Sequence, residues 1–266
     1  TDGTYEFCLE NCIKVWQKGP ERIAQGNFGM LEKATGDLIG YFDADMILSP
    51  SVVECAVLMF IKNPACVGVY IPEIIIGQSF WTKIRRFERS FYNGTVIDAV
   101  RVIKAKALKE VKGFDEINFP SPSAEDWDLD KRLKALGTLE LMEEFSNTPL
   151  NWNKNLYESL NIYLDKNDYN KNAFFHNESK FSLVWYLSKK NYYSSTIDNK
   201  LMKWGKDDPD VKKQFSILYR FFLVFIENGK WRKLIKNLHL AFFMYFMLFL
   251  VGLVFIKKKF KMPTNN

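Results

Sequence analysis

The sequence predicts an α/β domain, because short apolar runs typical of buried strands alternate with segments of helical length over its first 150 residues. Residues 38–42 and 66–71 are continuous apolar runs bounded by turn-forming residues, which indicates strands buried on both faces of a sheet. The composition is also that of a folded globular protein. Apolar residues make up 47% of the chain and aromatic residues 16%, which excludes a disordered or collagen-like protein.

The expected elements begin with a helix over residues 4–16, for which Thr4 is a favourable N-cap residue. The strand at 38–42 comes next, between a glycine and an aspartate. A helix over residues 50–62 follows, because a serine and then Pro50 are typical of a first helical turn.

After the second strand, charged residues recur along residues 81–92 at the spacing of an amphipathic helix. Residues 95–103 then have the character of a strand, and 104–111 that of a helix. The last pair is a helix over residues 125–136, which a glycine ends, and a strand over 138–142.

The remainder of the chain differs in composition. Residues 151–236 are rich in Asn, Lys and Tyr and have a mostly helical pattern, which predicts a helical, membrane-proximal region after the domain of residues 1–150. Residues 240–256 carry no charge and have lysine clusters on both sides. We therefore expect residues 237–266 to form one membrane helix and a basic tail, although a buried core helix would have a similar composition.

Charge and cysteine content exclude several classes of protein. The chain has 37 basic and 31 acidic residues, but eight of the basic residues lie after Glu227, so the preceding body is almost neutral and nucleic acid is not an expected partner. Four cysteines without a CxxC pair and two histidines exclude a closed zinc site or a disulfide scaffold. A reducing, cytoplasmic setting is expected.

The first candidate site is Asp43-Ala44-Asp45, at the end of the strand over 38–42. Open α/β sheets bind ligands at the carboxyl ends of their strands. Carboxylates placed there suit a hard divalent cation, which can neutralise a diphosphate. The same tripeptide is common in surface loops, so its position after a buried strand is what favours a function.

The second candidate is the acidic pair Glu125 and Asp126 at the start of a helix that also contains Arg132. One of the two acids could act as a general base. Acidic residues are also favoured at this position by the helix dipole alone, so the pair does not decide between the two interpretations.

These motifs occur together with others in a specific order: Gly26-Asn27-Phe28-Gly29, Lys33-Ala34-Thr35-Gly36-Asp37, the strand into Asp43-Ala44-Asp45, Gly113-Phe114-Asp115-Glu116, and Glu125-Asp126-Trp127-Asp128-Leu129 with Arg132. Over about residues 1–145 the chain thereby resembles family 2 glycosyltransferases of the GT-A fold. A weaker likeness to membrane-associated members continues through Phe175-His176-Asn177-Glu178 and Lys189-Lys190-Asn191-Tyr192-Tyr193.

The resemblance implies a three-layer GT-A sandwich, followed by the helical region and the membrane helix. Thr1-Asp2-Gly3-Thr4 is similar to the end of the family's nucleotide-binding loop. The family's first strand and its base-reading acid would lie before Thr1, so we expect the catalytic domain to be incomplete at its N-terminus.

The resemblance also implies an activity: metal-dependent transfer of a sugar from a nucleotide-diphosphate sugar, such as a UDP- or GDP-sugar, with inversion at the anomeric carbon. Asp43 would lie near the donor ribose, and Asp45 would hold Mg²⁺ or Mn²⁺ against the diphosphate. Asp126 would take the proton from the acceptor hydroxyl, with Glu125 as the alternative base or an acceptor contact. Arg132 would orient this loop or meet phosphate.

Three further residues are candidates on the same basis. His176 is expected at the metal or the diphosphate, Asn27 near the donor, and Arg101 at a donor phosphate. The acceptor is expected to be a glycan or a lipid-linked molecule at the membrane, with the catalytic domain facing the cytoplasm, where nucleotide sugars are made.

Two other functions remain open. A haloacid-dehalogenase-like phosphatase also carries D-x-D after an apolar strand and would use Asp43 as nucleophile and Asp45 as acid and base. That pattern has Thr or Val where Ile47 stands and lies on the first strand, whereas some forty residues precede it here. The other alternative is a non-catalytic or degenerate membrane-bound homologue.

Overall fold

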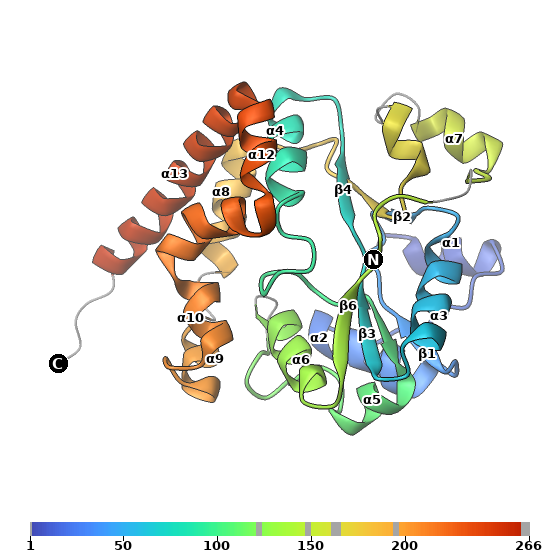
Figure 1. The fold of residues 1–266 in the computed structure, drawn as a ribbon. Coiled ribbons are helices and arrows are strands. Elements are labelled where there is room, and N and C mark those ends of the chain that lie inside the picture. Colours follow the sequence, from blue (N-terminus) through green and yellow to red (C-terminus); the bar gives the residue numbers. More distant parts are fainter. Residues whose placement is uncertain (1, 121–123, 147–149, 161–165, 194–196, 262–266) are drawn as a thin grey trace.

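The computed structural model describes residues 2–120, 124–146, 150–160, 166–193 and 197–261. Two small sheets lie on one side of the molecule, and a group of helices from the C-terminal region lies on the other (Figure 1). The predicted α/β class is confirmed.

The larger sheet has the strand order β1 (Leu38–Gly40), β5 (Val102–Lys104), β3 (Cys66–Tyr70) and β6 (Thr138–Leu141). β5 is antiparallel to both of its neighbours, whereas β3 and β6 are parallel. Every residue of β3 is buried, as its continuous apolar run predicts. All four strands were expected from the sequence, but β5 is shorter than the run at 95–103 suggests.

A second, three-stranded sheet was not expected. It has the order β2 (Met46–Leu48), β7 (Phe174–Asn177) and β4 (Glu73–Ile76). The central strand β7 is antiparallel to β2 and parallel to β4. Since β7 belongs to the otherwise helical C-terminal region, this sheet joins that region to the strands that follow the first acidic motif.

The helices of the N-terminal half agree with the predicted ones, apart from three near the beginning. Helix α1 ends six residues earlier than expected and has Gly3, not Thr4, at its N-cap; it buries no side chain, so no packing stabilises a longer helix. α2 and η1 were not expected. The helices of this half are α1 (Thr4–Glu10), α2 (Arg22–Asn27), η1 (Phe28–Lys33), α3 (Val52–Lys62), α4 (Phe80–Arg89), α5 (Ala105–Glu110) and α6 (Glu125–Lys134).

The C-terminal region is mostly helical, as predicted. Its helices are α7 (Lys154–Leu160), η2 (Lys166–Asn170), α8 (Leu183–Tyr193), α9 (Ile197–Trp204), α10 (Pro209–Phe215), η4 (Tyr219–Leu223), α11 (Val224–Ile226), η5 (Glu227–Gly229), α12 (Trp231–Lys236) and α13 (Leu238–Lys261).

The membrane helix expected over residues 240–256 is not found. Within the described part of the chain, no helix combines the length and the apolar character needed to cross a bilayer. One face of α13 packs against α4 and α8 and contributes to a buried cluster with Phe91 and Phe225. The side chains of α13 in this cluster are Ala241, Met244, Met247, Leu248 and Val251.

Candidate functional site

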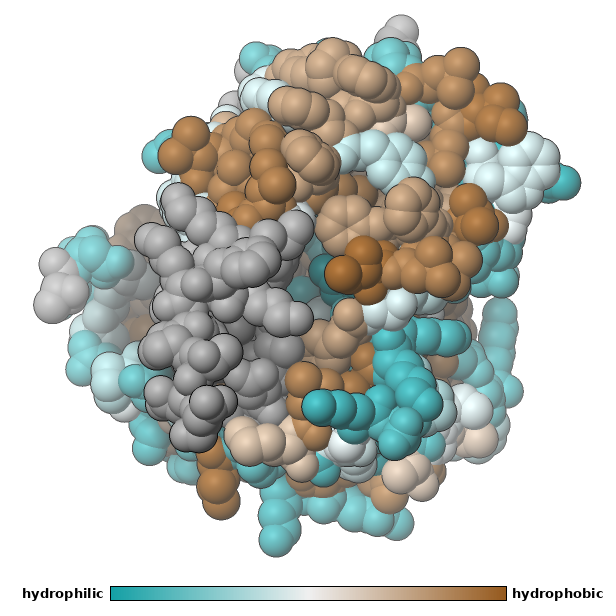
Figure 2. Space-filling model, turned by 90° about the vertical axis from the view of Figure 1, so that its left-hand side faces the viewer, coloured by the Kyte–Doolittle hydropathy of each residue, from teal (hydrophilic) through white to brown (hydrophobic). Residues whose placement is uncertain are grey.

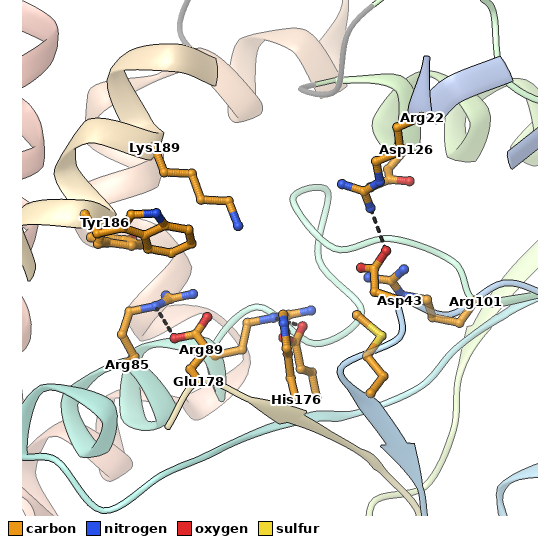
Figure 3. Close-up of a pocket in the computed structure, with 13 residues that line it drawn as sticks. Arg22, Asp43, Arg85, Arg89, Arg101, Asp126, His176, Glu178, Tyr186 and Lys189 are labelled. Atoms are coloured by element: carbon orange, nitrogen blue, oxygen red, sulfur yellow. Dashed lines mark hydrogen bonds and ion pairs between the residues drawn. The ribbon is translucent and has the colours of Figure 1, made fainter. Parts of the chain in front are cut away.

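The two acidic motifs meet at one pocket. It has a volume of about 280 Å³ and lies between the two sheets and helices α4, α6 and α8. Asp43 follows β1, Asp126 lies in the first turn of α6, Arg101 precedes β5, and His176 lies on β7. All four side chains line the pocket, and Figure 3 shows Asp43, Asp126 and Arg101 together on one side of it.

Each acid on this side has a defined partner. The Arg22 guanidinium donates to Asp43 Oδ1 at 2.8 Å, and the side chains of both residues are partly exposed. The Tyr41 hydroxyl donates to Asp126 Oδ1 at 3.1 Å, although the two residues are 85 positions apart. The Asp126 carboxylate is therefore held at the pocket by a residue that directly follows β1.

Asp45, His176 and Glu73 form a chain of contacts along the second sheet. β7 lies between β2 and β4, so His176 has Asp45 on one side and Glu73 on the other. Its Nε2 lies 3.3 Å from Asp45 Oδ2, and its Nδ1 lies 2.7 Å from Glu73 Oε1. Burial alone would lower the pKa of His176, but the hydrogen bond and charge of Glu73, followed by the charge of Asp45, raise it above its usual value.

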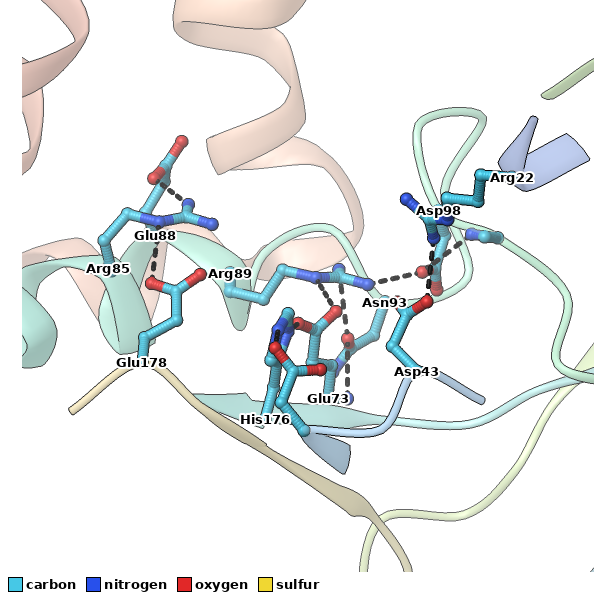
Figure 4. A network of polar contacts seen from close by, with 12 residues as sticks. Arg22, Asp43, Glu73, Arg85, Glu88, Arg89, Asn93, Asp98, His176 and Glu178 are labelled. Atoms are coloured by element: carbon cyan, nitrogen blue, oxygen red, sulfur yellow. Dashed lines mark hydrogen bonds and ion pairs between the residues drawn. The ribbon is translucent and has the colours of Figure 1, made fainter. Parts of the chain in front are cut away.

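This chain of polar contacts continues from Glu73 to Arg89 and Asp98, in the core beneath the pocket (Figure 4). Arg89 forms ion pairs with both Glu73 and Asp98, and its Nη2 lies 2.6 Å from Asp98 Oδ1. Burial would raise the pKa of Glu73, but Arg89 and then His176 hold it well below its usual range. Glu73 is thus a buried anion that fixes the histidine ring.

The structure brings only two of the three predicted metal ligands together. Asp45 and His176 lie together, whereas Asp43 is engaged by Arg22. No group of three His, Cys, Asp or Glu residues in the described ranges is arranged to hold a metal ion. One carboxylate and one imidazole fit a Mg²⁺ or Mn²⁺ site in which substrate phosphates supply further ligands.

Arg101 is the cation best placed to meet an anion. It is only 9% exposed, yet it lines the pocket. Its guanidinium carbon lies 5.3 Å from the ring centroids of both Tyr41 and Phe174, so two aromatic rings hold it. Within the described ranges no carboxylate lies within ion-pair distance of it.

The opposite wall comes from α4 and α8. Arg85 forms ion pairs with Glu88 and, at 3.6 Å, with Glu178, and its guanidinium carbon lies 4.9 Å from the Tyr186 ring. Figure 3 shows Lys189 on the same side, with its side chain extending toward the pocket. The pocket therefore has basic side chains on both walls: Arg22 and Arg101 on one, and Arg85 and Lys189 on the other.

Four of the predicted residues are not among those that line the pocket: Asp45, which contacts His176, and Asn27, Arg132 and Glu125. Asn27 and Arg132 have structural roles. The amide of Asn27 accepts from the Phe114 N–H at 2.8 Å and donates to the Phe114 carbonyl at 2.9 Å, so it holds the loop after α5. Arg132 donates to Asp128 at 2.7 Å and to the Val111 carbonyl. Glu125 is only 5% exposed.

Sequence reasoning missed several residues that line the pocket. Glu73 carries a signal that could have indicated it, since it is the only charge in the apolar run from Cys66 to Ile76. The arginines of α4 belong to the helix that the sequence predicts to be amphipathic, and nothing in that pattern distinguishes a polar face in solvent from one that lines a polar pocket. The missed residues are Arg22, Met46, Glu73, Arg85, Arg89, Glu178, Trp185 and Tyr186.

Neither a scan against protein-family models nor a search of curated protein sequences returns a match for this chain. A function for the pocket is therefore inferred from its own side chains.

Proposed function

We propose that the protein is an inverting glycosyltransferase, which moves a sugar from a nucleotide-diphosphate sugar to an acceptor hydroxyl. The observation that carries this proposal is the meeting of Asp43 and Asp126 at one pocket that also contains Arg101 and His176. A carboxylate able to act as a base, a cation for phosphate and a two-residue metal set are what such a transfer requires. We further propose that the α/β fold is of the GT-A type.

In this proposal Asp126 is the general base. It accepts the proton of the acceptor hydroxyl as that oxygen forms a bond to the anomeric carbon. The bond from that carbon to the diphosphate oxygen breaks in the same step, and the nucleoside diphosphate leaves with the electron pair. One displacement inverts the carbon and needs no covalent intermediate. Tyr41 keeps the Asp126 carboxylate oriented through its hydrogen bond.

In this proposal Arg101 stabilises the negative charge that develops on the leaving diphosphate. Its guanidinium is fixed between two rings, so little rotational freedom is lost when it binds a phosphate oxygen. Asp45 and His176 would hold Mg²⁺ or Mn²⁺, which when bound supplies further neutralisation of the diphosphate. Glu73 fixes the orientation of the His176 ring for this purpose.

The reaction is proposed to take place on the cytoplasmic side, where nucleotide sugars are made. All four cysteines are free thiols, which agrees with a reducing compartment.

A panel of UDP- and GDP-sugars tests the proposal, with Mg²⁺ or Mn²⁺ present and with nucleoside diphosphate release as the measured quantity. Asp126→Asn should abolish release and leave donor affinity nearly unchanged, whereas Asp45→Ala should weaken both metal binding and release. Asp207→Asn is the matched control, because the Asp207 side chain is fully exposed. Near wild-type release by the Asp126 variant would contradict the assigned role. Donor binding without release by any panel member would favour the non-catalytic alternative.

A further inference from the structure

Helix α13 exposes a continuous row of large apolar side chains. Their spacing of four, four, three and four residues places them on one face of the helix, opposite the face that packs in the core. They are 45–69% exposed. We call this row the α13 ridge; it consists of Leu238, Phe242, Phe246, Phe249 and Leu253.

Neighbouring elements widen the apolar surface around the ridge. Phe222 of η4 is 53% exposed and stacks on Tyr245, with 6.2 Å between the ring centroids. Phe80 of α4 is 45% exposed and meets the edge of Phe243 at 4.8 Å. Figure 2 looks at this side of the molecule and shows hydrophobic side chains gathered over its upper half, with hydrophilic ones below. A contiguous aromatic surface of this kind marks a contact site.

The charged residues that flank the ridge in the sequence are all basic. From Lys230 to the C-terminus the sequence contains eight basic residues and no acidic one. Arg232 and Lys236 are exposed on α12, directly before the ridge, and Lys257 to Lys259 follow it in the sequence. An apolar row that begins next to exposed cations, and that more lysines follow in the sequence, is complementary to a bilayer with acidic headgroups.

We propose that the α13 ridge docks the protein on the surface of an anionic phospholipid bilayer, with α13 lying in the plane of the membrane. The opposite face of α13 is part of the core with α4 and α8, so a helix surrounded by lipid on all sides would have to leave that core. Ridge-to-ridge contact between two copies would bring their cations together, which disfavours a second copy as the occupant. This inference does not depend on the proposed sugar transfer.

Vesicle co-sedimentation of the full chain tests the inference. One set of vesicles contains phosphatidylcholine alone, and the other contains phosphatidylcholine and phosphatidylglycerol in equal amounts. We expect binding to the second set, weakened by salt, and a loss of at least about tenfold in the Phe242→Gln/Phe249→Gln variant. The matched control is Val53→Gln/Ile61→Gln on α3, where both side chains are also exposed and which lies across the molecule from α13 (Figure 1). Circular dichroism checks that both variants fold.

Three results of the binding and sedimentation experiments would overturn the proposal: no binding to the acidic vesicles, equal loss in the ridge and control variants, or sedimentation equilibrium showing a dimer that only the ridge variant abolishes. Alkaline carbonate treatment of membranes from expressing cells separates docking from spanning. Release of the chain into the soluble fraction supports an in-plane helix, and retention in the pellet contradicts it.

Discussion

Replacing Asp130 by asparagine should remove a large part of the pH dependence of stability. Asp130 lies on α6, is 4% exposed, and accepts a hydrogen bond from the Val100 N–H at 3.2 Å and another from Tyr70. No cation in the described ranges forms an ion pair with it. Burial, reinforced by the charges of Asp126 and Asp98, raises the pKa of this carboxyl to about 8.

The direction in which stability changes with pH follows from the linkage between protonation and folding. The pKa is raised on folding, so the protonated acid contributes stability that is fully present below about pH 4 and is lost as the pH rises toward about 8. Between about pH 5 and pH 7 this group alone should cost the wild type about 3 kcal/mol. Asparagine has a similar shape, can accept from Val100 and can donate to the Tyr70 oxygen, so the variant should lack this loss.

Urea denaturation at both pH values measures the effect as the difference between wild type and Asp130→Asn. The free energy of unfolding of the variant should be the higher of the two at pH 7, with the gap closing toward pH 5. Asp207→Asn serves as the control, because that side chain is fully exposed. Parallel pH profiles for the wild type and the Asp130 variant would refute the argument.

Two further predictions separate structural from functional residues. Asn27→Ala should lower the free energy of unfolding by about 2 kcal/mol, because it leaves the buried N–H and carbonyl of Phe114 without their side-chain partner. Its affinity for the donor should be unchanged. Weaker donor binding without a loss of stability would reinstate Asn27 as a donor contact. Arg101→Lys should weaken nucleoside diphosphate binding by about tenfold in calorimetry, because lysine lacks the planar group held between Tyr41 and Phe174. Unchanged affinity would argue against Arg101 as a phosphate ligand.

The larger sheet and its helices were predictable because their signals are local. β3 is a fully buried apolar run, and α6 begins with acids and ends before a glycine. The position of Asp43 and Asp126 at one pocket follows from the same elements, since Asp43 lies shortly after β1 and Asp126 lies in the first turn of α6. Their roles in a reaction stay a prediction.

The second sheet and most of the residues that line the pocket were not predictable from the same signals. β2 directly follows the acidic motif and β7 lies in a region of mostly helical pattern, and their pairing depends on contacts between distant segments. Asn27 and Arg132 have residue types that suit a ligand site, but their hydrogen bonds to Phe114, Val111 and Asp128 are set by tertiary packing. Residue type and position alone do not contain that information.

The place of β7 in the middle of the smaller sheet also bears on how the protein is made. His176 contacts Asp45 across 131 positions and Glu73 across 103. The long segments between these residues must close into loops before β2, β7 and β4 can pair beneath the pocket. Pairing between such distant segments slows folding. During synthesis, β2 and β4 emerge from the ribosome long before their shared partner and have unpaired edges until it arrives. A nascent chain arrested before Phe174 should therefore be prone to aggregation and a substrate for chaperones.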